Sequence, residues 1–160
     1  VQTRSAVSTD GLTFVQEPGV RFSSDTGPIK APSVIQIGPT THLFWILTGG
    51  INGHATSTDA MTFEDVGTVD LGMGYVIAES GLEFGDGYRM FVFGPPNTDG
   101  HELYSAHSND GDSWTLDSEA LLPIDDGSSL ESKGIRGASA AKLKDGTYLM
   151  MYASNIPDDS

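Results

Sequence analysis

One short pattern occurs three times in this chain, and its spacing restricts the fold more than any other feature. Residues 8–14 (STDGLTF) return as 57–63 (STDAMTF) and 108–114 (SNDGDSW), about 50 residues apart each time. We call these segments the Asp turns. Their Asp and Ser oxygens accept backbone N–H groups, and Gly supplies a positive φ. We expect the closing aromatic residues, Phe14, Phe63 and Trp114, to be buried beneath equivalent turns.

Strand-like sequence on both sides of each Asp turn predicts an array of four-stranded β-sheets. The first complete unit covers residues 29–67 and includes the apolar strand 42–48 (HLFWILT), and the second covers 74–123. Residues 134–160 supply two inner strands of a further unit, and residues 1–22 supply two outer strands. The sequence therefore predicts one all-β domain over 1–160, with three blade-equivalents of four antiparallel strands and half-blades at both termini.

Three such sheets form a β-propeller only as part of a larger ring, because closed propellers contain about four to eight blades. The half-blades would also leave unpaired strand edges, which favour association. If residues 1–22 of one chain complete the blade begun by 134–160 of a second, a homodimer forms a six-bladed ring without open edges. The alternative is that these residues are a fragment of a longer propeller.

The charge of the chain excludes several classes of partner. It carries 22 acidic and 8 basic side chains, a formal net charge of -14, and no cysteine. Nucleic acids and anionic membranes bind Lys and Arg clusters, which the sequence lacks, so neither is predicted as a partner. No apolar run approaches the ~20 residues of a membrane span, and no signal peptide is recognisable. The acidity suits a secreted or salt-adapted protein, but the localisation stays open.

Candidate ligand residues come from the first strand of each unit, because this strand lines the channel of a propeller. Three matched positions follow from aligning these strands: Lys30 with Ile77 and Arg136, Pro32 with Glu79 and Ala138, and Ser33 with Ser80 and Ser139. Charged groups near a channel must be paired, solvated or used. Lys30, Glu79 and Arg136 are therefore either an ion-pair network between blades or part of a ligand site. The serines bond either the backbone or a ligand.

Loops at the same channel mouth add amide side chains to this list. Asn52, Asn97 and Asn155 are placed to bind sugar hydroxyls, although turn formation alone also explains them. The predicted ligand-binding residues are Lys30, Ser33, Asn52, Glu79, Ser80, Asn97, Arg136 and Ser139. Trp45 and Phe91 are assigned to the core, because they lie in apolar strands.

No metal or other cofactor is predicted from the sequence. The spacing of the four histidines, His42, His54, His101 and His107, does not match that of a known metal-binding motif. Residues 110–112 (DGD) lack the remaining ligands of a calcium loop, so they are interpreted as part of a turn.

The Asp turns, the strand opening 31–35 (APSVI) and the strands at 86–90 (DGYRM) and 145–150 (DGTYLM) resemble a known group. They resemble propeller glycoside hydrolases of the arabinanase, xylosidase and invertase-like superfamily and, more distantly, the Asp-box repeats of sialidases. The resemblance covers nearly the whole chain as repeats. It identifies blades more than an activity, because a fold does not fix a function.

Those hydrolases place two carboxylates beside the sugar bond that they cleave. The resemblance implies that the Asp-Pro of the family falls on Ala31 and Pro32, and that Gly137 occupies the same place in the last unit. The carboxylate is absent at both, which leaves Glu79 as the candidate catalytic acid. The implied function is a glycosidase-like propeller that binds carbohydrate without catalysis. The alternatives are an active glycoside hydrolase that uses Glu79, with Arg136 and Lys30 assisting, and an interaction scaffold without a small ligand.

Overall fold

The computed structural model describes residues 2–25, 27–47, 51–73, 77–85, 87–94, 102–122 and 134–154, with residues 77–81 and 136 described by their backbone alone. Every regular element in these ranges is a β-strand. Among the described residues no helix is long and apolar enough to cross a membrane.

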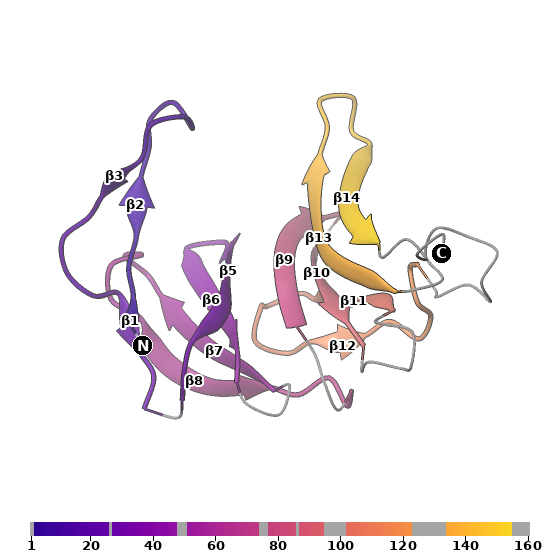
Figure 1. Ribbon diagram of the computed structural model, residues 1–160, viewed down its shortest axis with the longest axis horizontal. Coiled ribbons are helices and arrows are strands. Elements are labelled where there is room, and N and C mark those ends of the chain that lie inside the picture. Colours follow the sequence, from indigo (N-terminus) through magenta and orange to yellow (C-terminus); the bar gives the residue numbers. More distant parts are fainter. Residues whose placement is uncertain are drawn as a thin grey trace, which may run out of the picture.

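Two four-stranded antiparallel sheets form the centre of the molecule (Figure 1). The first sheet contains β5 (Lys30–Ile37), β6 (Thr40–Ile46), β7 (Asn52–Ser57) and β8 (Glu64–Val69), in that order. The second sheet contains β9 (Ile77–Phe84), β10 (Gly87–Phe93), β11 (Leu103–Ser108) and β12 (Thr115–Leu116). The prediction of an all-β fold with four-stranded antiparallel sheets is confirmed.

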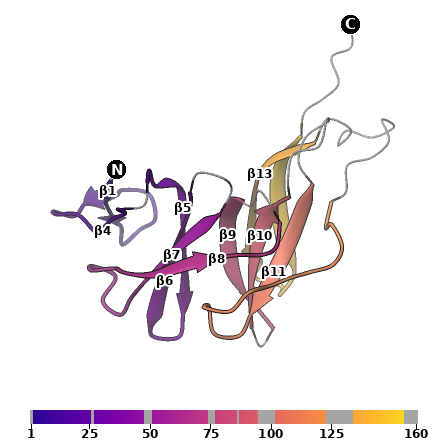
Figure 2. The same ribbon diagram turned by 90° about the horizontal axis from the view of Figure 1, so that it is seen from below.

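The remaining strands form two-stranded sheets. The C-terminal hairpin pairs β13 (Ile135–Lys142) with β14 (Tyr148–Ser154). In the N-terminal segment, β1 (Gln2–Thr3) pairs with β4 (Phe22–Ser23), and β2 (Ala6–Val7) pairs with β3 (Val15–Gln16). Both views place this segment and the C-terminal hairpin at opposite ends of the molecule (Figures 1 and 2). The six-bladed ring and the homodimer stay predictions.

The core lies between neighbouring sheets, where apolar side chains on both faces of β6 are covered. Leu43, Phe44 and Trp45 are at most 2% exposed, which explains why this strand lacks polar alternation. Gly53 on the adjacent strand lies directly against Trp45, because a Cβ added there would meet the indole ring at 2.2 Å. Phe91 is also buried, so the assignment of Trp45 and Phe91 to the core is confirmed.

The Asp turns share one hydrogen-bond pattern. The carboxylates of Asp10, Asp59 and Asp110 each accept two backbone N–H groups, from the residues two and three positions later, at 2.8–2.9 Å. Hydrogen bonds from the backbone of Thr13 and Leu12 and from the Ser8 hydroxyl lower the pKa of Asp10 to about 2. The predicted backbone hydrogen bonds of these turns are confirmed.

The aromatic residues that close the Asp turns are not all buried. Trp114 is half-buried against the first sheet, with its ring edge-on to Phe44 at 5.8 Å, and its Nε1 donates to Gly111 at 2.8 Å. Phe63 also packs, half-buried, beside an apolar cluster. Phe14 is 62% exposed, so its predicted burial is wrong. The first Asp turn belongs to a two-stranded sheet, and no described sheet of this chain lies beneath its ring.

The second Asp turn contains an alanine where the other two Asp turns contain glycine. Ala60 has a φ of 56°, and the equivalent Gly11 and Gly111 have φ of 74° and 82°. A Cβ is disfavoured in this left-handed region. We expect Ala60→Gly to raise the free energy of unfolding by about 0.5–1 kcal/mol, measured by urea denaturation.

The reverse change provides the control. A Cβ at Gly11 would meet nothing within 4 Å, so Gly11→Ala tests the φ preference without a clash and should lower stability by a similar amount. If Ala60→Gly leaves stability unchanged or lowers it, strain at Ala60 is contradicted.

Candidate functional site

The inner strands β5, β9 and β13 share an irregularity at the same place. Residues Lys30 to Ser33 of β5 span three steps, but their partners Ile46 and Phe44 on β6 are two steps apart. The same mismatch occurs in β9, where Glu79 is the extra residue, and in β13, where Gly137 is the extra residue. Each inner strand therefore contains a one-residue β-bulge. Bulges are found next to active sites, where they redirect a side chain.

The register also aligns the inner strands with one another. Ser33, Ser80 and Ser139 pair with Phe44, Phe91 and Met151, respectively, at equivalent positions of the three sheets. Strand β9 contacts both β5 and β13. We call residues 30–33, 77–80 and 136–139 together the inner-strand surface. Its three segments come from different sheets but occupy neighbouring strands.

The backbone is unusual where the resembled hydrolases have an aspartate. Ala31 has a φ of 44° and Gly137 a φ of 67°. A non-glycine residue in this region costs about 1–2 kcal/mol, so the bulge holds Ala31 in a strained conformation. Neither residue provides a carboxylate. The unusual backbone conformation is present at Ala31 and Gly137, but the aspartate side chain of the resembled hydrolases is not.

The described side chains of this surface are open to solvent to different degrees. Lys30 and Ser139 are exposed and Ser33 is half-buried. The Lys30 backbone pairs with Ile46, and no hydrogen bond or ion pair joins its side chain to another described residue. The side chains of Glu79, Ser80 and Arg136 lie outside the described atoms, so the alternative of an ion-pair network stays a prediction.

The predicted rim residues have different outcomes. Asn52 is the first residue of β7 and is 0% exposed, so its predicted place in an open loop is wrong. Its side chain is covered because the residue belongs to a strand and not to a loop. Asn97 and Asn155 lie outside the described residues.

Comparison with known proteins supports the fold. No protein-family model and no curated protein matches the chain. Among solved structures, it is similar to Zg3597, a family 117 glycoside hydrolase produced by the marine bacterium Zobellia galactanivorans, with a TM-score of 0.60 and 14% sequence identity. The match covers 78% of this chain and 49% of that one, so the chain spans about half of that protein. The fold is a glycoside-hydrolase-like propeller fold.

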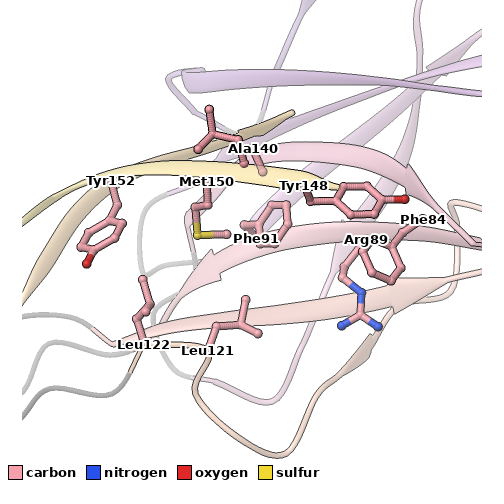
Figure 3. Close-up of a pocket in the computed structure, with 10 residues that line it drawn as sticks. Phe84, Arg89, Phe91, Leu121, Leu122, Ala140, Tyr148, Met150 and Tyr152 are labelled. Carbon is pink, nitrogen blue, oxygen red and sulfur yellow. The ribbon is translucent and has the colours of Figure 1, made fainter. Parts of the chain in front are cut away.

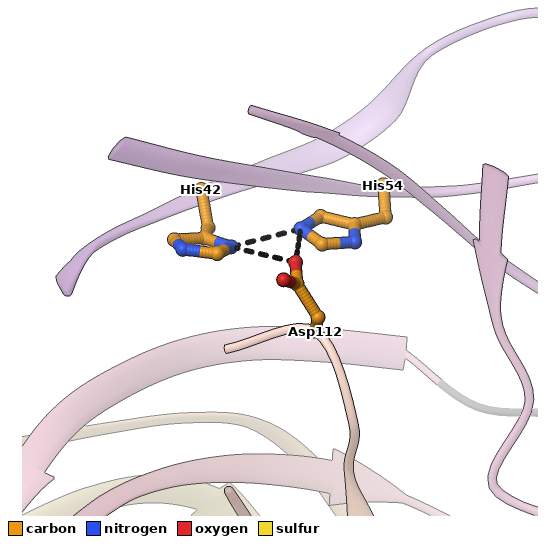
Figure 4. Close-up of side chains that lie close together, drawn as sticks. All are labelled: His42, His54 and Asp112. Carbon is orange, nitrogen blue, oxygen red and sulfur yellow. Dashed lines mark hydrogen bonds and ion pairs between the residues drawn. The ribbon is translucent and has the colours of Figure 1, made fainter. Parts of the chain in front are cut away.

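A second polar group lies between the two four-stranded sheets (Figure 4). His42 of β6 and His54 of β7 have stacked rings, 14° from parallel, and are 2% and 4% exposed. His42 Nδ1 lies 2.9 Å from His54 Nε2. Asp112, from the Asp turn of the second sheet, is 65% exposed, and its Oδ1 lies 3.8 Å from His42 Nδ1 and 4.0 Å from His54 Nε2. The two sheets thus bring together two imidazoles and one carboxylate, which are all groups able to bind a metal.

Both histidines have lowered pKa values. Burial is the main cause for His54, and the nearby His42 adds to it, so the pKa of His54 falls to about 4 although Asp112 opposes the change. Burial also lowers the pKa of His42, against the charges of Asp112 and Asp110. Both rings are therefore neutral at neutral pH. A cavity of about 430 Å³ lies over them, lined otherwise by Thr40, Thr56, Thr58, Val66, Thr68, Asp110 and Asp112.

The second sheet fills the matching position with an ion pair. The strand registers match His42 with Arg89 and His54 with Ser105. Arg89 Nη1 lies 2.8 Å from Asp117 Oδ2, and the Ser105 hydroxyl donates to the same oxygen. The two sheets therefore use this position differently.

Asp117 is held in its ionised form by this group. Burial alone would raise the pKa of Asp117, but hydrogen bonds from Ser105 and from His107, whose Nδ1 lies 2.8 Å away, lower it together with the Arg89 charge. In the first sheet Val66 stands the same number of residues after the turn aspartate as Asp117 does in the second. The adjacent first-sheet carboxylate, Asp65, accepts the backbone N–H of Gly67, and its charge opposes the fall in the pKa of His54.

Sequence reasoning missed the group formed by His42, His54 and Asp112. The two histidines are separated by a hairpin, and Asp112 comes from a different sheet. A signal was available in part. His42 opposes Thr56 and Phe44 opposes His54, so the histidines are diagonal neighbours on one face of two adjacent strands. The approach of Asp112 depends on how the sheets pack and has no local signal.

A third feature is an apolar groove of about 310 Å³ between the second sheet and the C-terminal hairpin (Figure 3). Phe91, Tyr148 and Met150 contribute to its walls. At one end the Arg89 guanidinium lies 4.9 Å from the centre of the Phe84 ring, which lies 4.5 Å from that of Tyr148. By strand register, Phe91 holds the position of Phe44 in the first sheet.

Proposed function

We propose that this chain is a carbohydrate-binding, non-catalytic relative of the propeller glycosidases and that the inner-strand surface is its binding site. One observation carries the proposal. The bulge recurs in three inner strands, but Ala31 and Gly137 stand where the resembled hydrolases place an acid. Binding geometry without paired carboxylates favours recognition over hydrolysis.

The chemistry of the surface suits sugar hydroxyls. Lys30 and Ser139 are exposed, and they offer an ammonium donor and a hydroxyl that both donates and accepts. Glu79, Ser80 and Arg136 join them through the alignment of the strands, and Asn97 is proposed for the rim on its sequence position alone. Several polar groups on adjacent strands are a common feature of ligand sites.

A specific observation favours glycoside hydrolysis as a second candidate. Glu79 is itself the extra residue of the β9 bulge, and a bulge is a means of redirecting one side chain. In this mechanism Glu79 protonates the leaving oxygen, and the second carboxylate has to come from a symmetry-related chain.

We also propose that a second copy of the chain completes the terminal half-blades. Met151 of β14 is 68% exposed, and β14 has β13 as its partner strand in the described structure. The N-terminal segment lies at the other end of the molecule (Figure 1), and Phe14 of its Asp turn is 62% exposed. Exposed apolar strand edges of this kind associate.

We propose that the Phe14 ring of the second copy binds in the apolar groove of Figure 3. Trp114 of the last Asp turn packs on Phe44 of the preceding sheet. Phe91 holds the position of Phe44, so the aromatic residue of the next Asp turn would pack on Phe91. That next turn is the first Asp turn of a partner chain, and it carries Phe14.

Carbohydrate binding can be tested with a glycan array of neutral and acidic sugars, followed by calorimetry on the best ligand. We expect saturable binding that Lys30→Ala weakens about tenfold, because a hydrogen bond to a charged group is lost. Lys144→Ala, in the exposed β13–β14 turn, is the control and should bind as the wild type does. An absence of binding at millimolar sugar would favour a scaffold without a small ligand.

Hydrolysis can be tested by release of a chromophore from a panel of aryl glycosides. The non-catalytic proposal expects no turnover by the wild type. Turnover that Glu79→Gln abolishes would establish the second candidate, and turnover that survives in Glu79→Gln would exclude Glu79 as the acid.

The dimer can be tested by sedimentation of the wild type at micromolar concentration. We expect a mass of two chains, and we expect Phe14→Ala to shift the equilibrium toward one chain, because truncating a buried aromatic anchor costs about 2 kcal/mol or more. Val66→Ala removes an exposed apolar side chain from β8 and should leave the dimer intact. A stable wild-type monomer would contradict the proposal.

A further inference from the structure

We propose that His42 Nδ1, His54 Nε2 and a carboxylate oxygen of Asp112 bind Zn²⁺, or a divalent transition metal of similar chemistry, between the two four-stranded sheets. This site is separate from the inner-strand surface. Its ligands come from β6, β7 and the Asp turn of the second sheet (Figure 4). The proposal does not depend on carbohydrate binding.

The separations of the three ligand atoms fit this metal. They are 2.9, 3.8 and 4.0 Å. A point equidistant from the three atoms lies about 2.1 Å from each, which is the length of a Zn–N or Zn–O bond. An ideal tetrahedral site has its ligands about 3.3 Å apart, so a small movement of the exposed Asp112 side chain is enough to reach it.

The types of ligand select the class of metal. Two imidazole nitrogens and one carboxylate are typical of zinc and its neighbours in the first transition row. Ca²⁺ and Mg²⁺ prefer sets of six or more oxygens. The cluster itself offers two imidazole nitrogens and one carboxylate, which is fewer oxygens than those ions need. The cavity over the histidines leaves the fourth zinc position to water or a small ligand.

The second sheet occupies the matching position without histidine. In the second sheet the matching residues are satisfied within the sheet by the Arg89–Asp117 ion pair. In the first sheet two buried imidazoles occupy this position, 2.9 Å apart at their nearest nitrogens, and each of these nitrogens lies within 4.0 Å of an Asp112 oxygen. A single hydrogen bond between the rings uses one lone pair, whereas a metal uses the lone pairs of both nitrogens.

A metal at this point would join two sheets that are otherwise held together by side-chain packing. Asp112 belongs to the turn whose Trp114 packs on Phe44. Binding to the folded form alone raises stability by mass action. The expected role is therefore a structural metal that links two blades. Its binding should raise the free energy of unfolding, in addition to being measurable as bound metal.

The test uses the full chain without a histidine tag, after treatment with a chelator. Calorimetry with ZnCl₂ should give one site per chain, and the melting temperature should rise with Zn²⁺ and not with Mg²⁺. Substitution with Co²⁺ should give the intense visible absorption of four-coordinate cobalt. The absence of saturable Zn²⁺ binding, or a cobalt spectrum of six-coordinate ions only, would overturn the proposal.

Three variants locate the metal. Asp112→Asn is the main one, because this exposed side chain can change without disturbing folding, and it should weaken Zn²⁺ binding at least about tenfold while the metal-free melting temperature stays the same. His54→Gln should abolish binding. His107→Gln, an exposed histidine outside the cluster, should bind as the wild type does. Equal binding by wild type and Asp112→Asn would show that the metal is held elsewhere and would overturn the assignment.

Discussion

The contact on which most of this structure depends is the packing of one sheet's Asp turn onto the preceding sheet. Trp114 seats on Phe44, and the turn that carries it is fixed by the Asp110 carboxylate and by its own indole N–H. A sheet of four strands has two apolar faces and cannot cover them alone. The same contact brings Asp112 to the histidines, and its absence around Phe14 leaves a ring in solvent.

Much of the fold could be predicted from the sequence, because its information is local and repeated. The Asp turns specify hairpins through hydrogen bonds within seven residues, and the apolar strand 42–48 announces burial on both faces. The alignment of Ser33, Ser80 and Ser139 from sequence agrees with the strand registers. The error at Phe14 came from applying a turn rule without asking which sheet would lie beneath it.

The sites were harder to predict, because they depend on contacts between sheets. Asn52 was placed in a loop since glycines precede and follow it, but β7 begins there and covers its side chain. His42, His54 and Asp112 are distant in sequence and meet only when the third Asp turn packs on the first sheet. No pattern of local spacing encodes such a meeting, because the distance between sheets is set by the bulk of side chains like Phe44 and Trp114.

The bulge in β5 determines which side of the sheet its residues occupy. Lys30 and Ser33 are three positions apart and would lie on opposite sides of a regular strand, but both pair with residues on one side of β6. Removal of a single residue between them would restore the regular pleat and leave both side chains on the same side, because residues two positions apart in a regular strand share a face. The bulge therefore adds one residue to the inner strand without reversing the faces of the residues that flank it, so the added side chain can change while the pairing on either side stays the same.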